Sequence, residues 1–220
     1  MPWSSFNINH PLKGSQMRLK IVVNGRDGFT PEMIEKHDTA ARLCEDAVNS
    51  VDFKEMVLNK LFTNSKGMTS ASIYESLMTG KETLDMSDDK EADVHVVAYH
   101  KNNSVVGYTY SYTHKTYVNT KFFNSYDYSG IAGNLWHEWT HKAGWDHSSA
   151  KDHDSVPYAT GYIVEDLVKK LMAGERLDQI DGSMSAPYAK EPVPYPVKTL
   201  VCYRSWRTLW RKKCYYKESV

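Results

Sequence analysis

The residues most able to do chemistry lie in one eleven-residue segment, HEWTHKAGWDH, which runs from His137 to His147. His137 and His141 are four residues apart, so on a helix both imidazoles lie on one face and can reach the same metal ion. Glu138 follows the first histidine directly. There its carboxylate lies beside the metal without ligating it and can accept a proton from a bound water.

Gly144 and His147 complete the segment. A glycine can take the left-handed conformation that ends a helix, so we expect Gly144 to turn the chain and bring His147 back as a third nitrogen ligand. Three protein ligands leave a fourth position for water, which is typical of catalytic rather than structural zinc. The sequence therefore predicts a Zn²⁺ site on His137, His141 and His147, with Glu138 as general base.

The segment resembles the zinc signature H-E-x-x-H-x-x-G-x-x-H of the metzincin clan of metallopeptidases. The likeness covers the active-site helix and the turn after it; elsewhere only the order of elements is compatible. It implies an α+β metzincin-like zincin with a twisted mixed sheet, an active-site helix and a C-terminal helix. It also implies hydrolysis of peptide bonds.

The chain departs from the metzincins at one place. Metzincins carry a methionine in a tight turn beneath the zinc, and at a matrixin-like distance from His147 this chain reads SVPY, residues 155–158, without methionine. We expect these residues to replace that turn, with Pro157 and Tyr158 as the floor of the site. Tyr158 either packs beneath the histidines or directs its hydroxyl toward the substrate oxyanion.

His153 is the one rival ligand, because it follows His147 closely and lies among aspartates. The Gly144 turn already places His147, so a supporting or solvated role is favoured for His153.

Length and charge limit the class of protein. The 220 residues suit one domain with an extension, and 27 basic residues balance 27 acidic ones, so no global charge indicates nucleic acid. The expected partner is a protein or peptide substrate, and no feature indicates an oligomeric state. Residues 1–20 lack an apolar stretch of signal-peptide length, and no apolar segment is long enough to span a bilayer. These features predict a soluble protein that is cytoplasmic or exported by a non-standard route.

Periodicity predicts the elements that position the segment. The active-site helix should begin near Asp127 or Ser129, and Trp136 and Trp139 should face the core. The expected strands are 19–23, 93–99, 104–112 and 116–123, and the other expected helices begin at Thr30, near Phe53, near Ser72 and at Tyr158, the last ending near Ala173.

The strand expected at 104–112 has a further role by resemblance. In metzincins such a strand forms the upper rim of the cleft, where an extended substrate adds itself as another strand. An ordinary interior strand is the alternative interpretation.

Composition divides the chain into a catalytic domain (15–180), a Pro-rich linker (181–197) and a basic aromatic tail (198–220). The tail can bind anionic membranes or nucleic acid, or it can pack on the domain and bury its aromatic residues; packing on the domain is favoured. Cys202 and Cys214 could pair within the tail, but an odd count of three cysteines and the lack of an export signal favour free thiols.

Together these features predict a zinc-dependent endopeptidase. One alternative is a non-catalytic, zinc-stabilised binding protein on a peptidase fold, against which Glu138 argues, because a structural site needs no general base. The other is a zinc hydrolase of non-peptide amides or esters, which only a substrate assay separates from a peptidase.

Overall fold

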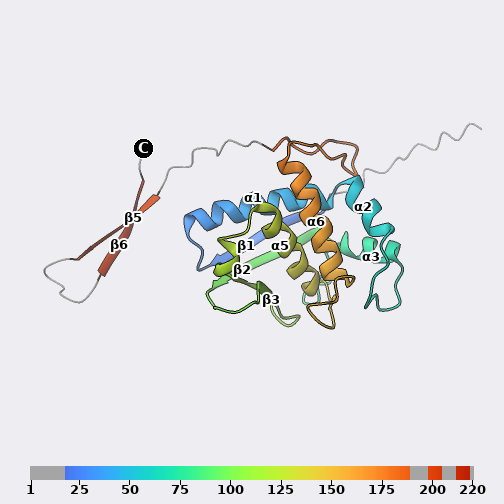
Figure 1. The fold of residues 1–220 in the computed structure, drawn as a ribbon, viewed down its shortest axis with the longest axis horizontal. Coiled ribbons are helices and arrows are strands. Elements are labelled where there is room, and N and C mark those ends of the chain that lie inside the picture. Colours follow the sequence, from blue (N-terminus) through green and yellow to red (C-terminus); the bar gives the residue numbers. More distant parts are fainter. Residues whose placement is uncertain (1–17, 189–197, 205–211, 219–220) are drawn as a thin grey trace, which may run out of the picture.

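A mixed sheet of four strands forms one layer of the main body (Figure 1). The computed structural model describes residues 18–188, 198–204 and 212–218. The strand order is β1-β2-β4-β3; β1, β2 and β4 are parallel, and β3 runs antiparallel to β4 at the edge. The strands are β1 Lys20–Asp27, β2 Glu91–Tyr99, β3 Gly107–Thr109 and β4 Lys115–Asn119.

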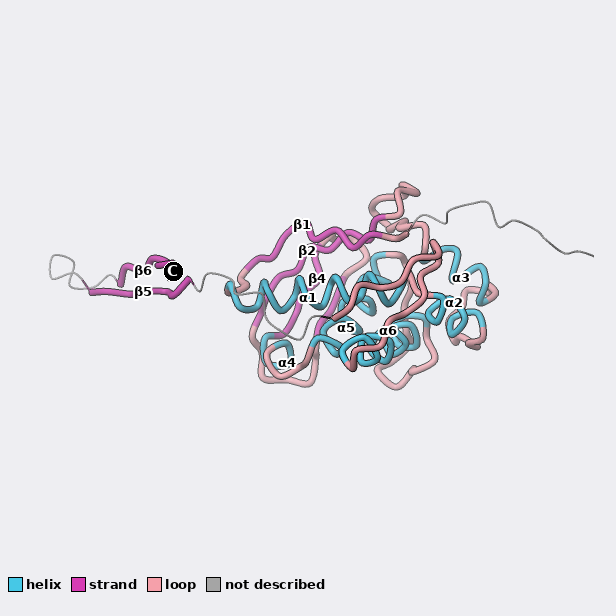
Figure 2. Tube along the Cα trace, turned by 90° about the horizontal axis from the view of Figure 1, so that it is seen from above, coloured by secondary structure: helices cyan, strands magenta, loops and turns pink. Residues whose placement is uncertain are grey.

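Helices form the second layer, on one side of the sheet (Figure 2). Alternate residues of β2, namely Ala92, Val94 and Val96, are buried in the core that the two layers share. The part of the chain that the structure describes is thus a mixed α+β fold, and none of its helices is long and apolar enough to cross a bilayer. The helices are α1 Pro31–Val48, α2 Val51–Leu58, α3 Ser70–Leu77, α4 Thr120–Phe123, α5 Tyr128–Lys142 and α6 Val156–Met172.

Capping side chains fix where the main helices begin. The Thr30 hydroxyl accepts a hydrogen bond from the Met33 amide, and Pro31 occupies the first turn of α1, where its missing N–H costs nothing. Asp127 caps α5 by accepting from the Gly130 amide at 3.0 Å. The predicted start of the active-site helix near Asp127 is therefore confirmed.

Two predicted strands are shorter in the structure. The strand expected at 104–112 pairs only over β3, and the one expected at 116–123 ends at Asn119, after which α4 begins. The Asn119 side chain accounts for the loop before β3 and for the end of β4, whereas a turn in which the Thr113 amide donates to the Tyr110 carbonyl ends β3. The side-chain amide of Asn119 donates to the carbonyls of Lys101 and Val105 and holds that segment as a loop, while its Oδ1 accepts from the Lys121 amide as the cap of α4.

The last helix begins earlier than predicted. Ser155 is its N-cap and Val156 its first residue, so Pro157 and Tyr158 belong to the first turn of α6 and do not form a separate tight turn. Proline is favoured at this position because its fixed φ suits a helix start.

Helices α5 and α6 pack closely where two glycines face each other. A Cβ on Gly133 would lie 2.9 Å from the Gly161 carbonyl oxygen, and a Cβ on Gly161 would lie 3.0 Å from that of Gly133 and 3.2 Å from the Cβ of His137. On the core side of α5, Trp136 and Trp139 are fully buried, as predicted. The glycine pair brings α6 against the helical turn that carries His137.

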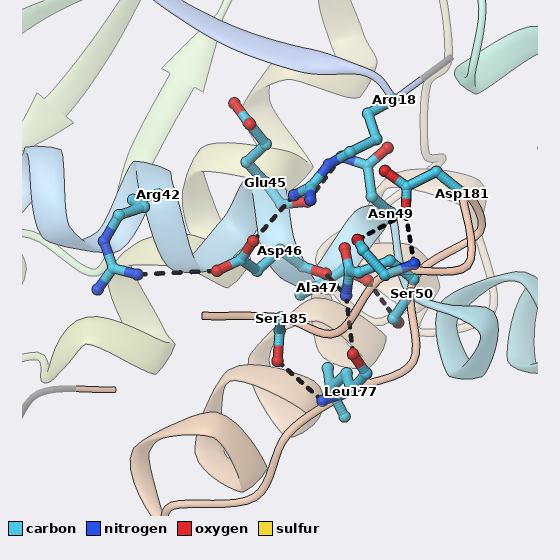
Figure 3. Close-up of polar contacts among 12 residues, drawn as sticks. Arg18, Arg42, Glu45, Asp46, Ala47, Asn49, Ser50, Leu177, Asp181 and Ser185 are labelled. Carbon is cyan, nitrogen blue, oxygen red and sulfur yellow. Dashed lines mark hydrogen bonds and ion pairs between the residues drawn. The ribbon is translucent and has the colours of Figure 1, made fainter. Parts of the chain in front are cut away.

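The segment after α6 returns to the C-terminal end of α1 (Figure 3). The buried Ser185 hydroxyl accepts from the Leu177 amide at 2.8 Å, and the Ile180 amide donates to the carbonyl of Asn49 at 2.9 Å. Arg18 forms an ion pair of 2.9 Å with Asp46 of the same cluster. Packing on the main body thus continues beyond residue 180, into the segment predicted as linker.

The tail forms an antiparallel hairpin of β5 Lys198–Arg204 and β6 Lys212–Glu218, whose register sets Cys202 opposite Cys214. The thiol state of these residues stays a prediction. So does packing of the tail on the domain, since the linker residues 189–197 lie outside the described residues. Residues 1–17, to which the expectation about a signal peptide applied, and 205–211, with Trp206 and Trp210, lie outside them too.

Candidate metal centre

Three histidines come together at the C-terminal end of α5. His137 and His141 lie on the helix and His147 in the loop after it, and one ring nitrogen from each lies within 4.8 Å of the others. Gly144, at φ +90°, makes the turn that returns the chain, and its amide donates to the His141 carbonyl. The predicted triad can therefore hold a metal ion.

The second ring nitrogen of His141 is already engaged. Its Nδ1 lies 2.7 Å from the Trp145 carbonyl oxygen, and a carbonyl can only accept, so Nδ1 carries the proton. The Nε2 lone pair is then free for a metal. Such a carbonyl partner fixes both the tautomer and the orientation of a ligating imidazole.

Burial keeps the other two imidazoles neutral, which is the form that binds metals. It lowers the pKa of His137 to about 3, an effect increased by His141 and His147 and opposed by a hydrogen bond with the backbone of Pro157. Burial also lowers the pKa of His147, with a smaller contribution from His141. His137 and His147 therefore each present a neutral nitrogen to a metal ion.

Glu138 lies on α5 and contacts the edge strand β3, which packs beside that helix (Figure 1). Its side chain is buried, and Oε2 accepts a hydrogen bond of 2.9 Å from the Thr109 hydroxyl. Burial raises the pKa of Glu138 to about 8, and the bond from Thr109 opposes that rise. The position next to the triad holds a carboxyl group with a strong tendency to keep a proton.

Tyr158 packs against the triad from α6. Its ring centroid lies 4.4 Å from that of His137 and 4.6 Å from that of His147. Burial raises the pKa of its hydroxyl, which is therefore neutral near pH 7. His153 lies outside the triad, and its Nδ1 is 3.0 Å from the hydroxyl of Tyr162, a neighbour of Tyr158.

A buried ion pair that the sequence analysis did not predict holds the end of α5. Lys142 Nζ lies 2.8 Å from Glu82 Oε2, and Glu82 Oε1 accepts from the indole of Trp139 at 2.7 Å. The Thr83 amide and hydroxyl both donate to the Lys142 carbonyl. In the sequence, only the presence of a lysine within the histidine segment could have drawn attention to this ion pair. Nothing in that segment identifies Glu82, 60 residues earlier, as the partner of Lys142.

The loop that carries His147 is fixed to the segment after α2. Asp152 accepts from the hydroxyl of Thr63 and from the amide side chain of Asn64, and Asp154 forms an ion pair of 2.6 Å with Lys60. These contacts join the residues that follow His147 to the segment after α2.

No protein-family description and no curated protein matches the chain.

Proposed function

We propose that this chain is a zinc-dependent endopeptidase of the metzincin type. The observation that carries the proposal is the arrangement of His137, His141 and His147 around one point, with the buried Glu138 on the adjoining face of the same helix. This arrangement agrees with the role of each fixed residue in the resembling segment.

Zinc is the ion that best suits these ligands. Three imidazoles at bond lengths of about 2.0–2.1 Å, with a fourth position open, are typical of catalytic zinc. Such bonds place the nitrogens roughly 3.3 Å apart, a modest contraction from the 4.8 Å limit of the ligand atoms here. Bound zinc would lower the pKa of water and polarise a carbonyl group.

Glu138 supplies the general base. Its carboxylate would take a proton from the attacking water and later deliver it to the leaving amine. Burial raises the pKa of Glu138 in the metal-free protein, and a carboxylate with a higher affinity for a proton is a stronger base.

The edge strand β3 supports a peptide as substrate. It is the last strand in the order of the described sheet, and Thr109 on it contacts Glu138 directly. An extended peptide that pairs with β3 would bring its backbone past Glu138 and the triad. A peptidase is therefore favoured over a hydrolase of small amides or esters.

The test is cleavage profiling of a peptide library by mass spectrometry, with the zinc-loaded protein, a chelator-treated sample and Glu138→Gln. We expect new peptide termini only with the zinc-loaded wild type. Glu138→Gln should keep the zinc and lose activity on the order of a hundredfold or more. An active Glu138→Gln variant would contradict the general-base role, and hydrolysis of esters but no peptide would favour the alternative enzyme.

A further inference from the structure

Two threonine hydroxyls form a chain of hydrogen-bonding contacts that leads from Glu138 into the sheet. Thr109 Oγ1 lies 2.9 Å from Glu138 Oε2 and 3.0 Å from Thr116 Oγ1, and Thr116 on β4 is buried. The two residues pair in register between β3 and β4, so the backbone sets their spacing. A line of hydroxyls in contact with a buried carboxyl group has no role yet in the proposed reaction.

The hydrogens available on the carboxyl group and the two hydroxyls determine which group donates and which accepts in these hydrogen bonds. An ionised carboxylate only accepts, and each hydroxyl has one hydrogen to donate. When Glu138 is ionised, Thr109 therefore donates to it, and Thr116 donates to Thr109.

The Thr109 hydroxyl is therefore held from both sides, by the carboxyl group of Glu138 and by the buried Thr116 hydroxyl. A side chain that is fixed in this way restricts where the carboxyl oxygen can lie.

Gly107 shows how closely the strand covers this carboxyl group. A Cβ at Gly107 would lie 3.0 Å from Glu138 Oε1 and 2.9 Å from the Tyr117 carbonyl oxygen. The strand therefore approaches one carboxyl oxygen through Gly107 and holds the other through Thr109.

We infer that Thr109 is a positioning residue for Glu138, and that Thr116 behind it holds the Thr109 hydroxyl in place. This inference deepens the proposed function and rests on it for the catalytic role of Glu138. The contact between Thr109 and Glu138 is testable without any activity.

The first test is steady-state kinetics of zinc-loaded variants on a peptide that the wild type cleaves. Thr109→Val should lower kcat on the order of ten- to a hundredfold, the effect of losing one hydrogen bond to a charged group, with KM and zinc content unchanged. Thr109→Ser should restore most of kcat, and Thr116→Val should cause a smaller loss. Thr39→Val, on α1, is the matched control and should behave as wild type.

The second test uses the metal-free protein and needs no substrate. Thermal unfolding of Thr109→Val, Glu138→Ala and the double variant forms a double-mutant cycle. We expect shifts in Tm that are not additive, because either single change removes the same hydrogen bond. Thr109→Ala replaces Thr109→Val in both tests if valine prevents folding.

The outcomes separate the two proposals. Additive shifts in Tm, wild-type kcat in Thr109→Val, or an equal loss in Thr109→Ser would overturn the positioning role. A wild type without hydrolysis on any peptide, together with non-additive shifts, would overturn the proposed function and leave the Thr109–Glu138 contact intact.

Discussion

The Tyr158 ring packs edge-on against the imidazole of His137, with centroids 4.4 Å apart and planes at 67°. The same ring lies 4.6 Å from that of His147. A residue on α6 thus contacts histidines from both α5 and the following loop, and the two roles that the sequence analysis expected for Tyr158, packing beneath the histidines or contact with the substrate oxyanion, stay predictions.

Removal of the Tyr158 ring should loosen the triad. We expect Tyr158→Ala to lower the free energy of unfolding by on the order of 2–3 kcal/mol, as for large-to-small changes in partly buried sites, and to weaken zinc binding. Tyr158→Phe keeps the ring and should keep both properties. Thermal unfolding and competition with a chromophoric chelator measure the two effects.

The Tyr158→Phe variant also separates the two roles of this residue. Unchanged turnover on a cleaved peptide would assign Tyr158 to packing alone. A lower turnover number with zinc affinity and Tm intact would assign its hydroxyl to the substrate oxyanion.

His147 should be required for tight zinc binding. Loss of groups that merely support a ligand typically costs 10–100-fold in affinity, so we expect His147→Ala to cost about a hundredfold or more. His153→Ala is the matched control, because His153 lies nearby but outside the triad. Elemental analysis and chelator competition check the prediction; a zinc-replete His147→Ala protein with unchanged affinity would show that the third ligand is another residue.

The local features of this site could be predicted because each depends on a few neighbouring residues. The spacing of His137 and His141 places both on one helical face, Asp127 caps that helix, and Gly144 has the positive φ that the return of His147 needs. These relationships need no knowledge of the rest of the fold.

The contacts that surround the site could not be predicted in the same way. The bond from Thr109 to Glu138 depends on how β3 lies over α5, and the ion pair between Glu82 and Lys142 joins a loop to a helix far along the chain. The alternating pattern at 104–112 favoured one long strand, but the long-range hydrogen bonds of Asn119 prevailed over that preference. Such outcomes depend on tertiary packing.

Gly133 should resist substitution although it lies inside a helix. Alanine there would gain roughly 0.5–1 kcal/mol of helix propensity, but its Cβ would lie 2.9 Å from the Gly161 carbonyl oxygen. We expect Gly133→Ala to destabilise the protein by about 1–3 kcal/mol and to weaken zinc binding, because α6 must move away from the turn that carries His137.

Gly130→Ala is the matched control for this prediction. It lies in the same helix, and the atoms nearest to its added Cβ lie 3.1–3.3 Å away in the Tyr126 side chain, a milder contact than the 2.9 Å approach of a Gly133 Cβ to a backbone oxygen. Chemical denaturation and zinc competition should show a larger effect for Gly133→Ala. Equal effects would mean that the contact between α5 and α6 does not position His137.

The stability of the metal-free protein should fall as the pH rises above 6.5, and Glu138 should be the cause. Burial raises the pKa of Glu138 from 4.5 to about 8, so between these values the folded state holds a proton that the unfolded state has released. Stability then declines with rising pH, by at most about 1.4 kcal/mol per pH unit for one proton. His137 has the opposite effect on stability, at lower pH. Burial lowers its pKa from 6.5 to about 3, so its contribution to stability rises with pH between these two values and is complete above 6.5.

Urea denaturation in the presence of a chelator, from pH 6.5 to 8, tests this prediction. The decline should appear in the wild type and in the exposed control Glu175→Gln, and little of it should remain in Glu138→Gln. The same decline in Glu138→Gln would assign the effect to another group.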